Sequence, residues 1–196
     1  EVINNVDTSV VGQYLVNFDC QDLSGNNAVK VTRTVTVVDT TVPVITLTGS
    51  ATVTIEAGSA YTDEGATALD AVDGNLDHAI EVINNVDTNV VGQYLVNFDC
   101  QDLSGNNALQ VTRTVTVVDT TPPVITLTGP ATVTVEAGFP YTDAGATALD
   151  AVDGNLDHAI EVINNVDTSV VGQYLVNFDC QDLSGNDAEQ VTRTVT

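Results

Sequence analysis

The amino-acid sequence repeats itself with a fixed period, and this repeat restricts the possible folds more than any other feature. The string Glu-Val-Ile-Asn-Asn-Val-Asp-Thr begins at Glu1, Glu81 and Glu161, so the period is 80 residues. Self-similarity at a fixed period is the sequence signature of a repeat architecture, in which every repeat folds as the same unit. The sequence therefore predicts a series of near-identical modules rather than one large domain.

The strongest turn signals mark the boundaries between modules. The segment 38–43 reads Val-Asp-Thr-Thr-Val-Pro, and it recurs at 118–123 with a second proline. Proline fixes φ and lacks an N–H, so it interrupts a strand at these places. We predict complete modules over 39–118 and 119–196, and the carboxy-terminal half of a module over 1–38. The half-module would leave strand edges unpaired, and either further repeats of a longer array or strands of another chain would cover them.

Within each module the pattern is that of short β-strands. Alternating, β-branched segments at 124–128 and 131–136 are separated by Gly129-Pro130. Further strands are expected at 146–149, at 158–163 and in a long hairpin with arms 173–180 and 190–196. About seven short strands with frequent turn signals are typical of a sandwich. The predicted fold class is all-β, as tandem immunoglobulin-like antiparallel β-sandwiches.

The charge balance excludes several classes of partner. Asp and Glu number 27 against four Lys and Arg, which gives a net charge of -23. A field of this sign repels nucleic acid and anionic membrane surfaces and attracts cations. The apolar runs are too short for a membrane span, so no membrane insertion is expected within this segment. The acidity indicates either divalent metal binding or adaptation of the surface to salt.

Each repeat carries one cysteine at the same position, namely Cys20, Cys100 and Cys180. One cysteine per module cannot close an internal disulfide. The alternation around Cys100 places it on the same strand face as Val96 and Phe98. We therefore predict a buried free thiol that behaves as a small hydrophobic residue.

Several motifs occur in one order in each complete module. In the last module they are 123–129, 135–138, 141–143, 145–146, 151–156 and 171–174, followed by Asp182 and Gly185-Asn186. This order resembles the bacterial surface-protein immunoglobulin-like repeat, which is similar to hyalin-type and cadherin-like repeats. The resemblance implies a cell-surface or secreted multidomain protein in which the repeat is a spacer, an adhesin stalk or an accessory module. It implies no catalytic residues, and the cysteine departs from the small residue more usual in the family.

Nothing in the sequence indicates an enzyme. Each complete repeat has one histidine, His78 or His158, far in sequence from Cys100 or Cys180. A nucleophile needs a base that is held next to it, and no motif here arranges such a pair. Paired carboxylates for glycoside hydrolysis would require an active site in every copy. We expect no catalytic activity.

Acidic and amide residues of each repeat are expected to gather at one end of the sandwich. In an immunoglobulin-type sandwich the start of the first strand, the loop after the second strand and the last hairpin loop lie at the same end. The first set is Asp39, Asp70, Asp73, Asn75, Asp77 and Asp102, and the second set is Asp119, Asp150, Asp153, Asn155, Asp157 and Asp182.

These side chains allow two hypotheses. Carboxylate and amide oxygens are the ligands of calcium, which takes six to eight of them. Asp and Asn also shape turns by bonding to their own backbone. The sequence therefore predicts either calcium sites at the module junctions or a set of residues that only form turns.

The leading functional hypothesis is a non-catalytic structural repeat of an extracellular or cell-surface protein. The array would serve as an adhesin stalk or form a filament, with calcium stiffening the junctions. Its partners would be neighbouring modules of the same chain and further copies in homotypic assembly. The alternative is a carbohydrate- or matrix-binding accessory module of a secreted multidomain enzyme.

Overall fold

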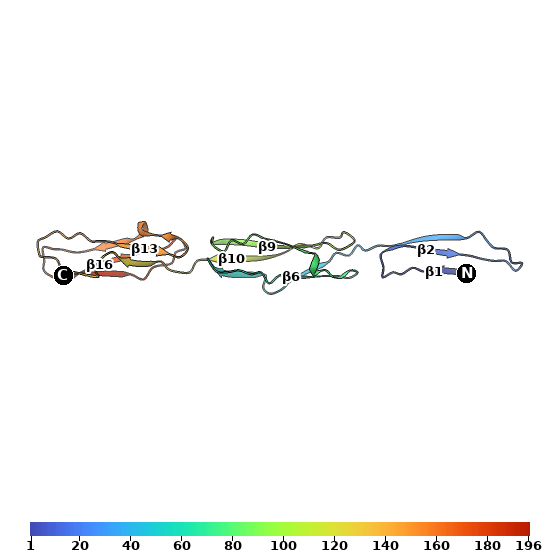
Figure 1. Cartoon of the computed structure of the whole chain (residues 1–196), viewed down its shortest axis with the longest axis horizontal. Helices are drawn as coiled ribbons and strands as arrows, with labels where there is room; N and C mark the ends of the chain where they lie inside the picture. The colour runs from blue at the N-terminus through green and yellow to red at the C-terminus, as the bar shows by residue number, and fades with distance from the viewer. The chain divides into compact units, whose positions relative to one another are not determined.

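The computed structural model describes residues 1–196, and its regular structure consists of 17 strands and two short 3-10 helices (Figure 1). No helix has the length and apolar character that a membrane span requires. The chain divides into two compact units. The first comprises Glu1–Val53, Thr62–Val86 and Tyr94–Val115, and the second comprises Thr54–Tyr61, Asp87–Gln93 and Thr116–Thr196.

The module over 119–196 contains seven strands in two sheets. The three-stranded sheet has the order β11 (Val124–Leu127), β13 (Ala146–Asp150) and β14 (Gly154–Asn155). The four-stranded sheet has the order β12 (Thr132–Val133), β17 (Val191–Val195), β16 (Tyr174–Asp179) and β15 (Glu161–Asn164). All pairs are antiparallel except β12 with β17, which is parallel.

The same arrangement of strands recurs in the module over 39–118. Its three-stranded sheet is β4 (Val44–Leu47), β6 (Ala66–Asp70) and β7 (Gly74–Asn75). Its four-stranded sheet is β5 (Thr52–Glu56), β10 (Val111–Val118), β9 (Gly92–Cys100) and β8 (Ile80–Asn84). The period-two alternation places every second side chain on the buried face, as in Val96, Phe98 and Cys100 of β9.

The core of the last module draws residues from both sheets. Its buried members are Ile125, Ala148, Leu156, Val176, Phe178, Cys180 and Val195. They come from the positions that the alternation assigns to one face of each strand. The prediction of an all-β, immunoglobulin-like sandwich of about seven strands is thereby confirmed.

Two predicted strands differ from the structure. The expected strand 131–136 is regular only at Thr132–Val133, whereas its counterpart β5 in the preceding module runs over Thr52–Glu56. The expected strand 158–163 begins instead with the 3-10 helix η2 (Asp157–Ala159), whose Ala159 N–H donates to Leu156 O at 2.8 Å. This turn follows the buried Leu156 and leaves His158 exposed. In the other module, the 3-10 helix η1 (Asp77–Ala79) leaves His78 exposed in the same way.

Residues 1–38 form a three-stranded sheet of β1 (Val2–Asn4), β2 (Gly12–Phe18) and β3 (Val31–Val37). Counterparts of the sheet made by β4, β6 and β7 do not occur in this segment. Its apolar side chains are consequently exposed, including Val31 and Leu23, and Val16 is its one buried hydrophobic residue.

Each complete module contains one buried arginine, Arg113 or Arg193, with 1% of its surface exposed. Arg193 Nε donates to Pro130 O at 3.0 Å, and its Nη2 donates to Thr128 O at 2.6 Å and to Gly145 O at 3.2 Å. Its Nη1 forms an ion pair with Asp143. Arg193 thus fastens the loops that follow β11 and precede β13 to the last strand of the module.

Hydrogen bonds keep the side chain of Asp143 in the charged form that pairs with this arginine. Burial by itself raises the pKa of Asp143, but hydrogen bonds from Tyr141, the Gly145 amide and Arg193 outweigh burial and lower the pKa. Arg113 makes the corresponding contacts with Ser50, Thr48, Gly65 and Asp63. The alternation of the strand places Arg193 on the same face as Val191 and Val195, but the sequence did not reveal the acceptors that a buried guanidinium meets there.

Replacing Arg193 with methionine should lower the free energy of unfolding of the last module by about 3 kcal/mol, because Asp143 and three carbonyl oxygens would stay buried without their donor. Urea-induced unfolding followed at residues of that module would measure the change. The matched control is Arg33→Met, since Arg33 is exposed and contacts only the Phe18 ring, at 5.6 Å. Equal effects of the two substitutions would contradict the assigned role.

The structure also places the cysteines. Cys100 and Cys180 are free and 5% exposed, as predicted, whereas Cys20 of the half-module is free and exposed. Burial, followed by the nearby charges of Asp102 and Asp182, raises the pKa of the two buried thiols. Their reactive thiolate form is therefore disfavoured.

A thiol reagent should accordingly label one cysteine rapidly in the native protein and the other two only after unfolding. The substitution Cys20→Ser should remove the rapid phase and leave the slow phase unchanged. The measurement is the labelling time course with and without urea. Rapid labelling of the Cys20→Ser variant in native conditions would show that the buried thiols are accessible.

Candidate metal centre

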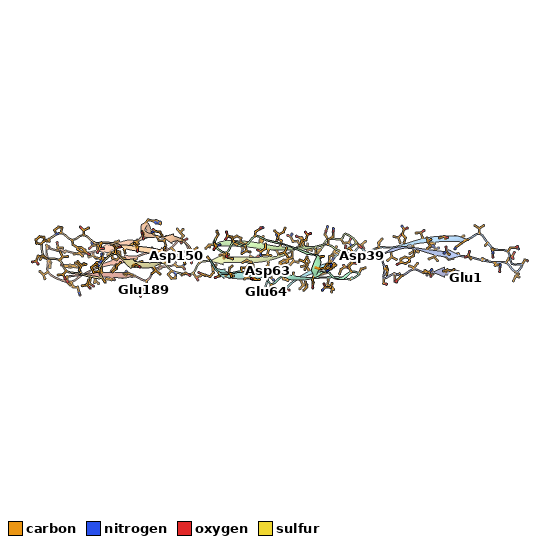
Figure 2. The ribbon with its side chains drawn as sticks, in the orientation of Figure 1. Glu1, Asp39, Asp63, Glu64, Asp150 and Glu189 are labelled. Atoms are coloured by element: carbon orange, nitrogen blue, oxygen red, sulfur yellow. The ribbon has the colours of Figure 1, made fainter.

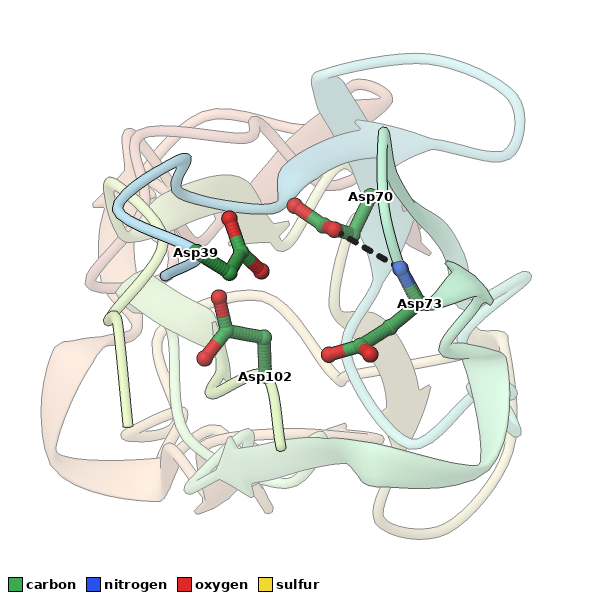
Figure 3. A group of neighbouring side chains, drawn as sticks. All are labelled: Asp39, Asp70, Asp73 and Asp102. Carbon is green, nitrogen blue, oxygen red and sulfur yellow. Dashed lines mark hydrogen bonds between the residues drawn. The ribbon is translucent and has the colours of Figure 1, made fainter. Parts of the chain in front are cut away.

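Four carboxylates of the module over 39–118 lie close together at the end where the linker enters. Asp39 is in the linker after β3, Asp70 ends β6, Asp73 is in the turn before β7, and Asp102 is in the loop after β9. One oxygen of each lies within 4.8 Å of the others. Figure 3 shows the four side chains converging on one space from separate segments of the chain.

The last module has the same arrangement. Asp119, Asp153 and Asp182 each bring a carboxylate oxygen within 4.8 Å of the other two. Asp150, labelled in Figure 2, is buried beside them and accepts a hydrogen bond from the Asp153 amide at 2.9 Å. We call these two groups the first acid cluster (Asp39, Asp70, Asp73, Asp102) and the second acid cluster (Asp119, Asp150, Asp153, Asp182).

Asp39 and Asp70 of the first acid cluster each shape their own turn with one carboxylate oxygen. Asp39 Oδ1 accepts from the Thr41 amide at 2.9 Å. Asp70 Oδ1 accepts from the amides of Val72 at 2.7 Å and Asp73 at 3.0 Å. These are the local bonds that favour aspartate in tight turns. These turns fix the direction of the Asp39 and Asp70 carboxylates and leave the second oxygen of each available.

The second oxygens of four of these acids are buried without a hydrogen-bond partner. They are Oδ2 of Asp39, Asp70, Asp119 and Asp150. The four residues are 8%, 3%, 6% and 4% exposed. A buried anionic oxygen that lacks a partner is destabilising, and a cation beside it removes that cost. The positions of these four atoms are therefore the strongest structural argument for a cation.

No basic side chain neutralises the acid clusters. The two ion pairs between side chains join Arg113 to Asp63 and Arg193 to Asp143. Asp73 Oδ2 and Asp153 Oδ2 accept from the amides of Leu103 and Leu183 at 2.9 and 2.8 Å, which are neutral donors. The negative charge of each cluster is thus left to solvent or to a bound ion.

An asparagine that was not among the predicted site residues positions each cluster. Asn186 Nδ2 donates to Asp182 Oδ2 at 2.8 Å and to Asp119 O at 3.2 Å. The backbone N–H of Asn186 donates to Asp182 Oδ1 at 2.7 Å. Asn106 makes the corresponding bonds to Asp102 and Asp39. The sequence signal was Gly185-Asn186, which indicates a turn; Gly185 has a φ of 91°.

These bonds favour the charged form of the acid that they hold. Burial by itself raises the pKa of Asp182, but hydrogen bonds from Asn186 and from the loop amides outweigh it, so the net pKa is lowered. The pKa of Asp102 is lowered by the same balance with Asn106. Both residues are therefore carboxylates, ready to bind a cation, throughout the neutral range.

The remaining four predicted residues form one separate turn in each module. They are Asn75 with Asp77, and Asn155 with Asp157. Asp157 Oδ1 accepts from the Ala148 amide at 2.8 Å, and its Oδ2 accepts from Asn155 Nδ2 at 3.0 Å. Asn155 Oδ1 in turn accepts from the Asp157 amide at 3.1 Å. Asn75 and Asp77 bond in the same way. These side chains are occupied in joining η1 and η2 to β6 and β13.

Comparison with known families places the modules. The profile of the family described as bacterial surface protein, Ig-like domain, matches residues 45–117 and 125–196. The chain belongs to this family. The matched ranges lie within the two complete Ig-like modules, and the resemblance inferred from the motifs is confirmed. Membership of a family of Ig-like surface domains indicates a surface or extracellular location.

Two curated relatives cover nearly all of these Ig-like modules. Hyalin from Lytechinus variegatus is 34% identical over 195 residues, and hyalin from Strongylocentrotus purpuratus is 36% identical over 194 residues. The alignments cover 91% and 95% of this chain but only 35% and 16% of the two hyalins. The chain therefore spans about a third of one hyalin and a smaller part of the other.

Solved structures show weaker similarity. A lipoprotein from Bacteroides thetaiotaomicron is 15% identical with a TM-score of 0.37, over 76% of this chain and 78% of that chain. A Clostridium perfringens structure of a catalytic domain with two CBM51 domains is 12% identical with a TM-score of 0.39, over 97% of this chain and 34% of that chain. Both are too distant to indicate a function.

The two roles of the predicted acids can be separated by substitution. Asp157→Ala should speed hydrogen exchange at the Ala148 amide, because its acceptor is removed, whereas Asp182→Asn should leave that amide protected. Hydrogen bonds, first of all from Ala148, lower the pKa of Asp157 below 3.8. The wild-type protection should therefore persist above that pH and weaken as the pH falls through the lower folded-state value. Unchanged exchange in Asp157→Ala would contradict the structural role.

Proposed function

We propose that the chain is a non-catalytic structural segment of a surface or extracellular protein, and that each complete Ig-like module binds one calcium ion at its acid cluster. The observation that carries the proposal is the set of buried carboxylate oxygens without partners, Oδ2 of Asp39, Asp70, Asp119 and Asp150. They lie beside other carboxylates that no basic side chain neutralises. A cation of double charge would remove this repulsion and satisfy the unpaired oxygens.

The donor set favours calcium over other divalent metals. Every candidate ligand is a carboxylate oxygen, and calcium prefers several such oxygens in flexible geometry, with carbonyls and water completing six to eight ligands. Zinc would require imidazole or thiolate ligands, and His78, His158 and the buried cysteines belong to neither cluster. Magnesium usually retains most of its water and binds one or two carboxylates rather than three or four.

The proposed ion would join segments that are distant in sequence. Asp39 and Asp119 belong to linkers, whereas the other acids belong to loops of the module that follows. Binding would therefore fasten each linker to the next Ig-like module. Near-identical modules with fixed linkers suit a spacer, as in an adhesin stalk or a filament-forming array, with binding specificity located elsewhere in the protein.

One observation favours the alternative of a ligand-binding accessory module. Phe139 is 62% exposed in the last module, where the preceding module has Ser59. Modules that bind sugars present several exposed aromatic rings, and this position offers one ring in one copy. If Phe139→Ala abolished binding to a panel of glycans, the accessory role would replace the structural role.

Calorimetry tests the metal sites directly. Calcium should bind to two sites per chain. Extracellular modules typically bind calcium with a dissociation constant of about 0.1 mM. At that affinity, 1 mM calcium should add about 1.4 kcal/mol to the free energy of unfolding per site. The double substitution Asp153→Asn with Asp182→Asn should remove one site, because it deletes two charges of the second acid cluster. Thermal unfolding with calcium and with chelator measures the stabilisation.

The matched control is Asn155→Ala, which removes a predicted ligand whose side chain bonds only within its own turn. It should leave both calcium sites intact. The absence of binding heat in the wild-type protein, together with an unchanged melting temperature, would reduce the acid clusters to turn-forming residues and surface charge.

A further inference from the structure

The linker between the complete modules is bonded to the module that precedes it. Glu56, at the end of β5, accepts hydrogen bonds from the Thr120 amide at 2.8 Å, from Thr120 Oγ1 at 2.9 Å and from Thr121 Oγ1 at 3.0 Å. The Thr120 amide bond is the largest contribution that lowers the pKa of Glu56. A single carboxylate therefore holds two consecutive linker residues.

The residue just before these threonines is bonded to the module that follows. Asp119 O accepts from Asn186 Nδ2 at 3.2 Å, and Asp119 Oδ2 is the buried, unpartnered oxygen of the second acid cluster. Asp119 Oδ1 accepts from the Thr121 amide at 3.1 Å, so the orientation of Asp119 depends on Thr121. Glu56 and the second acid cluster thus act on adjacent atoms of one short segment.

We propose that Glu56 is a positioning residue for the second metal site, and that it increases the calcium affinity of that site by holding the linker residues Thr120 and Thr121 in place. This inference rests on the proposed calcium binding. Glu56 does not touch the cluster, but it restrains Thr120 and Thr121 and therefore Asp119. A ligand that is already ordered loses less conformational freedom when it binds the ion. The coupling is reciprocal, so calcium should also strengthen the bonds between Glu56 and the linker.

The chain contains internal controls for this coupling. At the first acid cluster the equivalent threonines are Thr40 and Thr41, and no carboxylate accepts a hydrogen bond from either side-chain hydroxyl. Glu136 is the counterpart of Glu56 in the last module, and its side chain makes no hydrogen bond. Substitution of Glu56 should therefore affect one calcium site, and substitution of Glu136 should affect neither.

The experiment uses the full chain with one site disabled at a time. In the background Asp73→Asn with Asp102→Asn, calcium binds only at the second acid cluster, and Glu56→Gln should weaken binding roughly fivefold in calorimetry. In the background Asp153→Asn with Asp182→Asn, only the first acid cluster binds, and Glu56→Gln should leave the affinity unchanged. Glu136→Gln should have no effect in either background.

Hydrogen exchange at the Thr120 amide supplies a readout that does not require calcium. In chelator, Glu56→Gln should speed this exchange, because the acceptor loses its charge. Calcium should slow the exchange in protein that retains Glu56. Both results support the coupling.

The outcomes distinguish the inference from the proposed function. If calcium binds the second site with the same affinity with and without Glu56→Gln, the positioning role is overturned while calcium binding stands. If Glu56→Gln weakens both sites equally, the effect is general and the specific coupling is also overturned. If no variant binds calcium, the proposed function and this inference fail together.

Discussion

A buried guanidinium organises each complete Ig-like module. Arg193 donates to backbone carbonyls in the loop after β11 and in the loop before β13, and it pairs with Asp143. A sandwich of this size has a small core, and its single cysteine cannot form an internal disulfide, so it has little surplus stability with which to bury a charge. The buried charge is tolerated because the guanidinium finds acceptors at Pro130, Thr128, Gly145 and Asp143. These bonds fix the loop after β11 and the loop before β13 relative to β17. Ile125 and Ala148 of one sheet can then pack with Val176 and Phe178 of the other.

The acid clusters lie at the other ends of β11 and β13, and of their counterparts β4 and β6, away from the loops that this arginine holds. The two hypotheses for these acids, turn formation and metal binding, concern different oxygen atoms and different residues. Asp70 Oδ1 closes its turn, whereas Asp70 Oδ2 is buried without a partner. Asp157 uses both oxygens, one to accept from the Ala148 amide of β13 and the other to accept from Asn155 in its own turn. Aspartates of neighbouring loop positions thus differ in whether donors reach both carboxylate oxygens or only one.

Neighbouring residues of the linker between the Ig-like modules likewise bond to different partners. Thr120 and Thr121 bond to Glu56 of the preceding module, and Asp119 bonds to Asn186 of the following one. Short polar segments usually remain mobile because they bury little, but here every backbone and side-chain donor of Thr120 and Thr121 has an acceptor. Hydrogen bonds thus restrain Asp119, Thr120 and Thr121, and a cation at Asp119 would add an electrostatic restraint. This chemistry suits a spacer built from repeated surface domains.

The sequence alone determined the repeat, the all-β sandwich and the family, because period-two alternation and proline-bearing turns are local properties of the chain. It also selected the loops whose acids converge, since the ends of strands in an immunoglobulin-like sandwich follow from the topology. It could not separate Asp153, whose carboxylate lies in a cluster, from Asp157, whose carboxylate closes a turn, and it did not reveal Arg193, Asn186 or Glu56. The roles of Arg193, Asn186 and Glu56 depend on contacts between residues 50 to 67 positions apart, and only the tertiary structure decides which side chain meets which acceptor. The contacts that separate Asp153 from Asp157 join residues 30 and nine positions apart.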